Sequence, residues 1–260
     1  MTLSGKKYLI TGASSGLGFA IVNELLKHQG TKIVAVARNI KSLENMPKNR
    51  VFSLSLDVAK AKNIDFMIDE AMGMMGGIDC IIACAGFGYY EAFKNRDYGH
   101  IQRIFQTNVL SPFYTLERFL LKTKGRIAFV AIASMLAKFG QPGMALYSST
   151  KHALDGFHDS YRHEKPKRLH YMTVYPIGMK TNFWKRMAKN IPLSKPMQSP
   201  NTAARAILKG LQKGKGILYT SQGAKVALYL NRMLLIIIPL YQHARKIKLD
   251  RWLKRSAKQS

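Results

Sequence analysis

A glycine-rich turn directly follows the first apolar run of the chain and precedes the first amphipathic stretch. The run covers residues 7–10, the turn reads TGASSGLG at residues 11–18, and apolar side chains recur at helical spacing over residues 19–28. Between a strand and a helix, the glycines permit a tight turn, close approach of backbone N–H groups to a pyrophosphate, and close helix packing. The helix N-terminus also attracts phosphate. We therefore expect a dinucleotide site, although the spacing G-x-x-x-G-x-G also fits a plain turn.

Apolar runs and helical patterns alternate along most of the remaining chain. Strands are expected at residues 33–37, 51–56, 78–83, 126–133, 169–175 and 217–220, and helices at residues 101–121, 147–164 and 203–212, with a Met-rich helix between the third and fourth strands. Alternation of this kind predicts an α/β fold with a parallel sheet covered on both faces. We expect one Rossmann-type, doubly wound domain of about seven strands over residues 1–225, with residues 226–260 as an apolar and then basic extension of that domain.

The second expected strand ends at Ala37 and is followed by Arg38. A site that selects NAD usually places an acidic residue here, where it binds the ribose 2′-hydroxyl. A guanidinium suits a phosphate better than a hydroxyl. The sequence therefore favours NADP(H), with the 2′-phosphate bound by Arg38 and assisted by Ser14 from the glycine turn.

Tyr147 and Lys151 are four residues apart in an expected helix. This spacing places both side chains on one face, one turn apart. Because a nearby cation favours the phenolate, we expect Lys151 to lower the pKa of Tyr147 towards the range of a general acid–base. The spacing alone also fits an exposed tyrosine beside a solvated lysine.

The two cysteines, Cys80 and Cys84, lie on one apolar run. Four strand residues span roughly 13 Å, too far for a disulfide. We expect both thiols to be buried and reduced, as in a cytoplasmic protein. No targeting peptide and no metal-ligand spacing is recognised, so we expect no metal.

The motifs occur in an order and at intervals that resemble the short-chain dehydrogenase/reductase family over residues 6–220. TGASSGLG resembles the family's cofactor turn, and Ala83-Cys84-Ala85-Gly86 resembles its Asn-Asn-Ala-Gly element, with Cys84 in place of an Asn. Asn108, Ser134, Tyr147 and Lys151 fall at the positions of the family's catalytic residues. By this resemblance the cofactor contacts are Gly12, Ser14, Ser15, Gly16, Leu17, Gly18, Arg38, Asp57, Val58, Ala85, Gly86, Tyr147, Lys151, Pro176, Gly178 and Thr181.

The resemblance implies hydride transfer between a nicotinamide and a carbonyl or secondary alcohol. Tyr147 would donate a proton to the carbonyl oxygen, and Ser134 would orient that carbonyl by a hydrogen bond. Lys151 would lower the Tyr147 pKa and bind the nicotinamide ribose. Asn108 would hold a water that links Lys151 to solvent. Hydroxyl donors and a buried cation would together stabilise the negative charge that develops on oxygen.

Positive charge is concentrated in the second half of the chain. Residues 1–130 hold 17 basic and 10 acidic side chains, whereas residues 131–260 hold 24 and 4. This asymmetry fits an anionic partner such as a membrane surface or an acidic substrate, or a solvated surface without a partner. Residues 226–240 are apolar but too interrupted to span a bilayer. With the basic residues 241–260 they fit peripheral membrane attachment, a dimer interface, or packing under the substrate site.

Several alternatives remain open at the level of sequence. In residues 178–200, where the family has its substrate lid, apolar and cationic side chains are mixed, which fits a lipid-like substrate or an ordinary amphipathic helix. An oxoacyl-thioester reductase with an anionic carrier is a second activity, and a non-catalytic, cofactor-sensing or membrane-bound protein of the same fold is a third. Nucleic-acid binding would explain the charge but not the motifs, so we do not expect it. By resemblance we expect a homo-oligomer.

Overall fold

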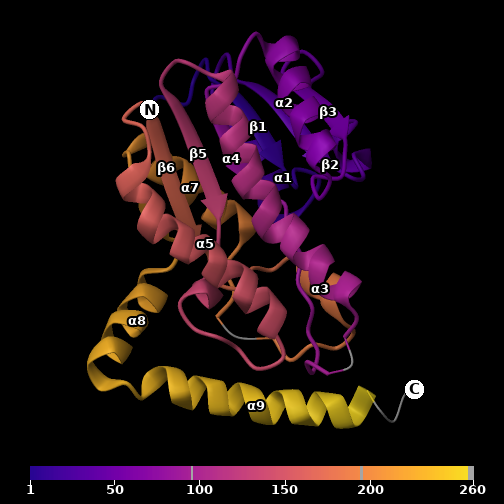
Figure 1. The fold of residues 1–260 in the computed structure, drawn as a ribbon, viewed down its shortest axis with the longest axis vertical. Coiled ribbons are helices and arrows are strands. Elements are labelled where there is room, and N and C mark those ends of the chain that lie inside the picture. Colours follow the sequence, from indigo (N-terminus) through magenta and orange to yellow (C-terminus); the bar gives the residue numbers. More distant parts are fainter. Residues whose placement is uncertain (95, 194–195, 257–260) are drawn as a thin grey trace.

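Seven parallel strands form one sheet in the order β3-β2-β1-β4-β5-β6-β7 (Figure 1). The computed structural model describes residues 1–94, 96–193 and 196–256. The strands are β1 (Lys7–Thr11), β2 (Lys32–Ala37), β3 (Val51–Ser55), β4 (Cys80–Ala83), β5 (Ile127–Ile132), β6 (Leu169–Tyr175) and β7 (Ile217–Tyr219). The strand order reverses direction between β1 and β4, the switch point at which such sheets bind ligands. The doubly wound α/β prediction is confirmed.

Helices cover both faces of the sheet because its central strands are apolar on both sides. On one face pack α1 (Gly16–Leu26) and α7 (Pro200–Gln212), the latter begun by an N-cap from Ser199 and by Pro200. On the other face pack α2 (Ala61–Met75), α4 (Ser111–Lys122) and α5 (Ala145–Glu164). Figure 1 shows α4 and α5 crossing in front of the sheet. Two methionines of α2, Met67 and Met75, are buried there, so they fill the core.

The prediction of one continuous α-helix over residues 101–121 is wrong. It is divided into α3 (Tyr98–Phe105), a π-helical segment (Gln106–Leu110) and α4. The N–H of Ser111 bonds the carbonyl of Gln106, five residues back. Pro112 follows and has no N–H to donate, which removes one α-helical hydrogen bond at this point. A π-helical turn of this kind is frequent at functional sites.

The C-terminal extension forms two helices, α8 (Gln222–Leu234) and α9 (Ile237–Ser256). They meet at Leu235, which has a left-handed φ of 52°. Figure 1 shows α8 below α5 and α9 running along the bottom of the molecule, beneath α5 and α3. In the described part of the chain, no helix has the length and apolar character needed to cross a bilayer.

Candidate active site

The glycine turn joins β1 to α1 through contacts that leave no room for side chains. Gly12 has φ 68°, and a Cβ built on it would lie 2.8 Å from the Ala85 Cα atom. A Cβ on Gly18 would lie 2.2 Å from the carbonyl oxygen of Gly12. The helix begins at Gly16, three residues before the expected start, and its N-cap Ser15 makes no side-chain capping bond. First-turn N–H groups at such an end are suited to bind phosphate.

The segment after β4 is held against this turn by Thr11. Its hydroxyl oxygen accepts hydrogen bonds from the N–H groups of Cys84 and Ala85, both at 3.1 Å. These bonds place Ala85 beside the turn, against Gly12. Cys84 lies just after the strand and is only partly buried, so the expectation of two buried strand cysteines is confirmed for Cys80 alone. Desolvation raises the pKa of Cys84 to about 12, which keeps the thiol neutral.

The other expected cofactor residues lie at the same edge of the sheet, where the strands end. Arg38 follows β2 and is exposed. Asp57 follows β3, where its carboxylate accepts from the N–H of Ala59 at 3.0 Å, and Val58 is buried beside it. Ser14 is fixed through its carbonyl, which accepts from the Ser42 hydroxyl at 2.6 Å. The parallel topology therefore brings these residues to one edge.

Two hydroxyl groups meet at the carboxyl end of β5. Ser134 follows this strand, and its oxygen accepts from the N–H of Leu136 at 3.2 Å. The Ser134 side chain also hydrogen-bonds the phenol of Tyr147, which lies in the first turn of α5. Lys151 lies one turn later, buried, with its ammonium donating to the carbonyl of Ile132 at 2.8 Å. The structure thus brings together Ser134, Tyr147 and Lys151. Asn108 also lies near Lys151, since a Cβ built on Gly86 would lie 3.2 Å from the Asn108 Oδ1 atom and 3.8 Å from the Lys151 Nζ atom.

The prediction that Lys151 lowers the pKa of Tyr147 below its ordinary value is wrong. Desolvation raises the pKa of Tyr147 to about 12, and the hydrogen bond with Ser134 opposes that rise only in part. The Lys151 nitrogen bonds the Ile132 carbonyl and lies 5.6 Å from the centre of the Tyr147 ring. Desolvation also lowers the pKa of Lys151 to about 8. At neutral pH Tyr147 therefore keeps its proton, as a proton donor must.

Asn108, in the π-helical segment, is buried and bonded through its side chain. Its amide donates to the Phe87 carbonyl at 2.8 Å and to the Thr150 hydroxyl at 3.1 Å, and its oxygen accepts from the Phe87 N–H at 3.1 Å. The Thr150 hydroxyl in turn donates to the carbonyl of Tyr147 at 2.7 Å. Asn108 thereby fastens the loop after β4 to the catalytic helix. Its expected role in holding a water stays a prediction.

Two residues of the segment expected to form a lid, Phe183 and Met187, lie against Tyr147. The Phe183 ring stands edge-on to Tyr147, with centroids 5.7 Å apart. A Cβ on Gly88 would touch both the Met187 Cε atom, at 2.7 Å, and the Tyr147 ring, at 3.0 Å. Gly88 and Thr11 were not singled out from the sequence. Thr11 stands at the start of the glycine motif and could have been, whereas nothing local marks Gly88.

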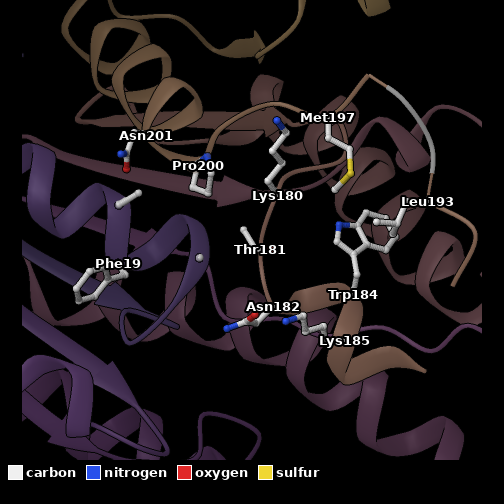
Figure 2. A pocket seen from close by; sticks show the side chains of 12 residues that line it. Phe19, Lys180, Thr181, Asn182, Trp184, Lys185, Leu193, Met197, Pro200 and Asn201 are labelled. Carbon is white, nitrogen blue, oxygen red and sulfur yellow. The ribbon is translucent and has the colours of Figure 1, made fainter. Parts of the chain in front are cut away.

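A groove of about 610 Å³ separates the start of α1 from the lid (Figure 2). Figure 2 shows Phe19 on one side, Trp184 and Leu193 on the other, and Thr181 between them. Thr181 lies against the glycine turn, 3.4 Å from a Cβ built on Gly16. Pro176 reaches the catalytic side, where its carbonyl accepts from the Met135 N–H at 2.9 Å. The groove therefore touches the cofactor turn but not Tyr147 or Ser134.

These features fit a nicotinamide dinucleotide: a glycine cradle without room for a Cβ, a free helix N-terminus, and a buried cation beside two hydroxyls. The model of the short chain dehydrogenase family matches residues 6–192. The chain belongs to this family. As a short-chain dehydrogenase it is an oxidoreductase, and the family uses NAD(H) or NADP(H).

Similar proteins include lipid and acyl reductases. A 3-dehydrosphinganine reductase of Danio rerio is 27% identical over 237 residues, covering 82% of this chain and 70% of the relative. The ketoacyl reductase HetN of Nostoc is 30% identical over 222 residues, covering 81% and 77%. A short chain dehydrogenase of Burkholderia cenocepacia, solved in complex with NADP, is 24% identical with a TM-score of 0.77, covering 95% and 99%.

Proposed function

We propose that this short-chain dehydrogenase reduces the carbonyl of an apolar, lipid-like substrate with NADPH. The observation that carries the proposal is the grouping of Ser134 at the end of β5, the Tyr147 phenol beside it, and the buried ammonium of Lys151 5.6 Å from the Tyr147 ring centre. All three groups lie next to the glycine turn, at the carboxyl edge of the sheet. A protein that only sensed the cofactor would not need this set.

Each residue has a defined task in the proposed reaction. The bound reduced nicotinamide supplies a hydride to the carbonyl carbon. Tyr147 gives its proton to the carbonyl oxygen, and Ser134 donates a hydrogen bond that orients it. The Lys151 charge favours the tyrosinate left behind. Asn108 keeps the loop at Phe87 in place against the catalytic helix.

The surroundings of Tyr147 support an apolar substrate. It packs in a cluster with Tyr90, Leu136, Met144 and Leu249, to which Trp184, Met187 and Ile191 are added from the lid. Relatives are named for the reduction of 3-dehydrosphinganine and of ketoacyl groups. The second name, together with the basic second half of the chain, also favours an oxoacyl thioester as substrate.

A substrate panel tests the proposal directly. Long-chain ketones, short water-soluble ketones, aldehydes and oxoacyl thioesters are each incubated with NADPH, and its oxidation is followed by absorbance. We expect turnover to rise with chain length of the ketone or acyl group. Lack of turnover with every carbonyl compound would contradict the assignment.

We expect Arg38 to determine the preference for NADPH. Arg38→Ala should weaken NADPH binding about 10- to 100-fold, since charge-assisted hydrogen bonds to phosphate contribute about 1.5–3 kcal/mol. NADH affinity should change about twofold or less. Titration by cofactor fluorescence measures both. Lys32→Ala is the matched control, because Lys32 is an exposed cation at the opposite end of the same strand. Equal losses for both cofactors would contradict a 2′-phosphate contact.

We also propose that the protein attaches to anionic membranes through an apolar elbow, defined as residues 226–240 where α8 meets α9. Five apolar side chains at the centre of the elbow are highly exposed: Met233, Leu234, Leu235, Ile236 and Leu240 are each between 54% and 81% accessible. The following helix carries Lys246, Lys248, Arg251, Lys254 and Arg255. Apolar insertion combined with basic charge is a known route to stable peripheral binding. A homo-oligomer, expected by family resemblance, remains a second proposal for partners.

Changing Met233 to Gln and Leu235 to Asn tests the elbow without disturbing the fold. Asn tolerates the left-handed conformation at position 235 better than Leu. Losing two apolar side chains should reduce co-flotation with anionic liposomes at least about tenfold, with unchanged turnover of a soluble ketone. Leu121→Asn is the control, because Leu121 is 65% exposed on α4. Flotation equal to that of the wild type would contradict the elbow as an anchor.

A further inference from the structure

Arg245, on α9, is buried without a counter-charge. Only 3% of the residue is exposed. One guanidinium nitrogen donates to the carbonyl of Pro192 in the lid, at 2.8 Å. Its Nε and Nη1 atoms have no hydrogen-bond partner among the described residues, and none of the ion pairs in that part of the chain involves Arg245. A buried, unpaired guanidinium is strongly unfavourable, so the site has unused capacity for an anion.

The guanidinium lies beside the apolar cluster that contains the catalytic tyrosine. Leu249, one turn further along α9, is a buried member of that cluster. A Cβ on Gly143 would touch both the Leu249 side chain, at 3.0 Å, and the Tyr90 ring, at 2.8 Å. Tyr90 is two residues from Gly88, which contacts Tyr147, and two residues span at most ~7 Å. Helix α9, which carries Arg245, and the Tyr147 ring therefore border the same cluster, of which Tyr90 is a member.

A second polar group next to Arg245 also lacks a partner. The buried hydroxyl of Tyr90 makes no hydrogen bond within the described ranges. Trp252 and Leu249 lie on the same face of α9 as Arg245, at i+7 and i+4. The Tyr90 ring stands edge-on to Trp252 with centroids 5.1 Å apart, so Tyr90 packs against the face of α9 that carries Arg245. Two guanidinium nitrogens without partners among the described residues and one phenol hydroxyl form a donor set suited to the oxygens of a carboxylate or phosphate.

We propose that Arg245 and Tyr90 form a subsite for the anionic group of an amphipathic substrate, with the apolar cluster holding its hydrocarbon part. This subsite rests on the proposed function, because the molecule bound there is a substrate only if the protein reduces it. It identifies the ligand class as an apolar chain with a carboxylate or phosphate oxygen, and it disfavours a cationic head, which Arg245 would repel.

Binding of non-reacting amphiphiles tests the subsite without relying on turnover. The two tryptophans, Trp184 and Trp252, both pack in the cluster, so intrinsic fluorescence reports occupancy. The full-length protein is titrated with decanoate, decyl phosphate and decanol below their aggregation concentrations. We expect the wild type to bind both anions more tightly than decanol. The stronger of the two anions then distinguishes a carboxylate from a phosphate head.

Arg245→Gln should weaken anion binding about 10- to 100-fold, the range of a charge-assisted hydrogen bond, and change decanol binding about twofold or less. Lys248→Gln removes an exposed charge from the same helix and should leave the affinities for the anions and for decanol unchanged. Parallel loss of decanoate and decanol affinity would assign Arg245 a purely structural role and overturn the subsite. If Arg245→Gln does not fold, equal binding of decanoate and decanol by the wild type overturns it. NADPH oxidation with neutral ketones would survive that failure, which separates this inference from the proposed function.

Discussion

Tyr147→Phe is expected to abolish carbonyl reduction while leaving the cofactor bound. The substitution removes one oxygen atom, which is both the proton donor and the hydrogen-bond partner of Ser134. Loss of a general acid lowers turnover about 10²–10⁴-fold. Phe fills the same space beside Phe183 and Met187, so packing of the lid should persist. Steady-state NADPH oxidation measures kcat, and cofactor fluorescence measures NADPH affinity, which should change about twofold or less.

Tyr161→Phe is the matched control for this experiment. Tyr161 lies on the same helix, α5, and its hydroxyl has no hydrogen-bond partner in the described chain. Its ring packs between Phe157 and Tyr171, away from the lid. Turnover should therefore remain at the wild-type level. If Tyr147→Phe kept more than about a tenth of the activity, proton donation by this phenol would be untenable.

Gly18→Ala is expected to destroy the cofactor turn. The added methyl would lie 2.2 Å from the Gly12 carbonyl oxygen, a backbone atom that no rotamer change can move. The turn must open, and forcing extra atoms into a packed region costs about 1–3 kcal/mol. We expect NADPH affinity to fall at least about 100-fold, since the phosphate-binding N–H groups move with the turn. Urea unfolding and NADPH titration measure the two effects.

Gly73→Ala provides the comparison within the same fold. Gly73 lies inside helix α2, and no atom lies within 4 Å of a Cβ built there. Alanine should therefore stabilise the protein by about 0.5–1 kcal/mol through its higher helix propensity. NADPH affinity should stay unchanged. If Gly18→Ala and Gly73→Ala had the same free energy of unfolding and the same NADPH affinity, the Gly12–Gly18 contact would not constrain the turn.

The sheet and the glycine turn could be predicted because their signals are local, and Ser134 and Lys151 were placed by the resemblance to the family. Strands such as Ile127–Ile132 are almost wholly apolar, which is typical of a parallel strand covered on both faces. The cofactor turn is a continuous motif of eight residues. Parallel topology then brings the strand ends together without further information.

The features that sequence reasoning missed depend on partners far apart in the chain. The π-helical break involves Asn108, whose bonds reach Phe87 and Thr150. The raised pKa of Tyr147 reflects desolvation, to which lid residues 36 or more positions away contribute by packing on its ring. A pairwise rule for Tyr and Lys at helical spacing includes the Coulomb effect of the cation but not this desolvation.

The apolar tail could be recognised but not placed. Sequence reasoning left membrane contact, a dimer interface and packing beneath the substrate site open for residues 226–240. In the structure Leu228 and Ile238 pack against the body while Met233 and Leu235 face outward. One apolar stretch therefore supplies both core and surface, a division that depends on the turn at Leu235.

Helix α9 has a consequence for how such a protein can diversify. Its side chains touch the lid at Pro192, through Arg245, and at Lys189, through the Trp252 indole N–H at 3.0 Å. It also meets the segment before α5, where Gln242 donates to the Gly140 carbonyl at 2.9 Å. One side of the proposed substrate site is thus encoded by α9, apart from the residues proposed for hydride transfer. Substitutions confined to α9 are expected to change which molecules are accepted while the proposed chemistry is kept.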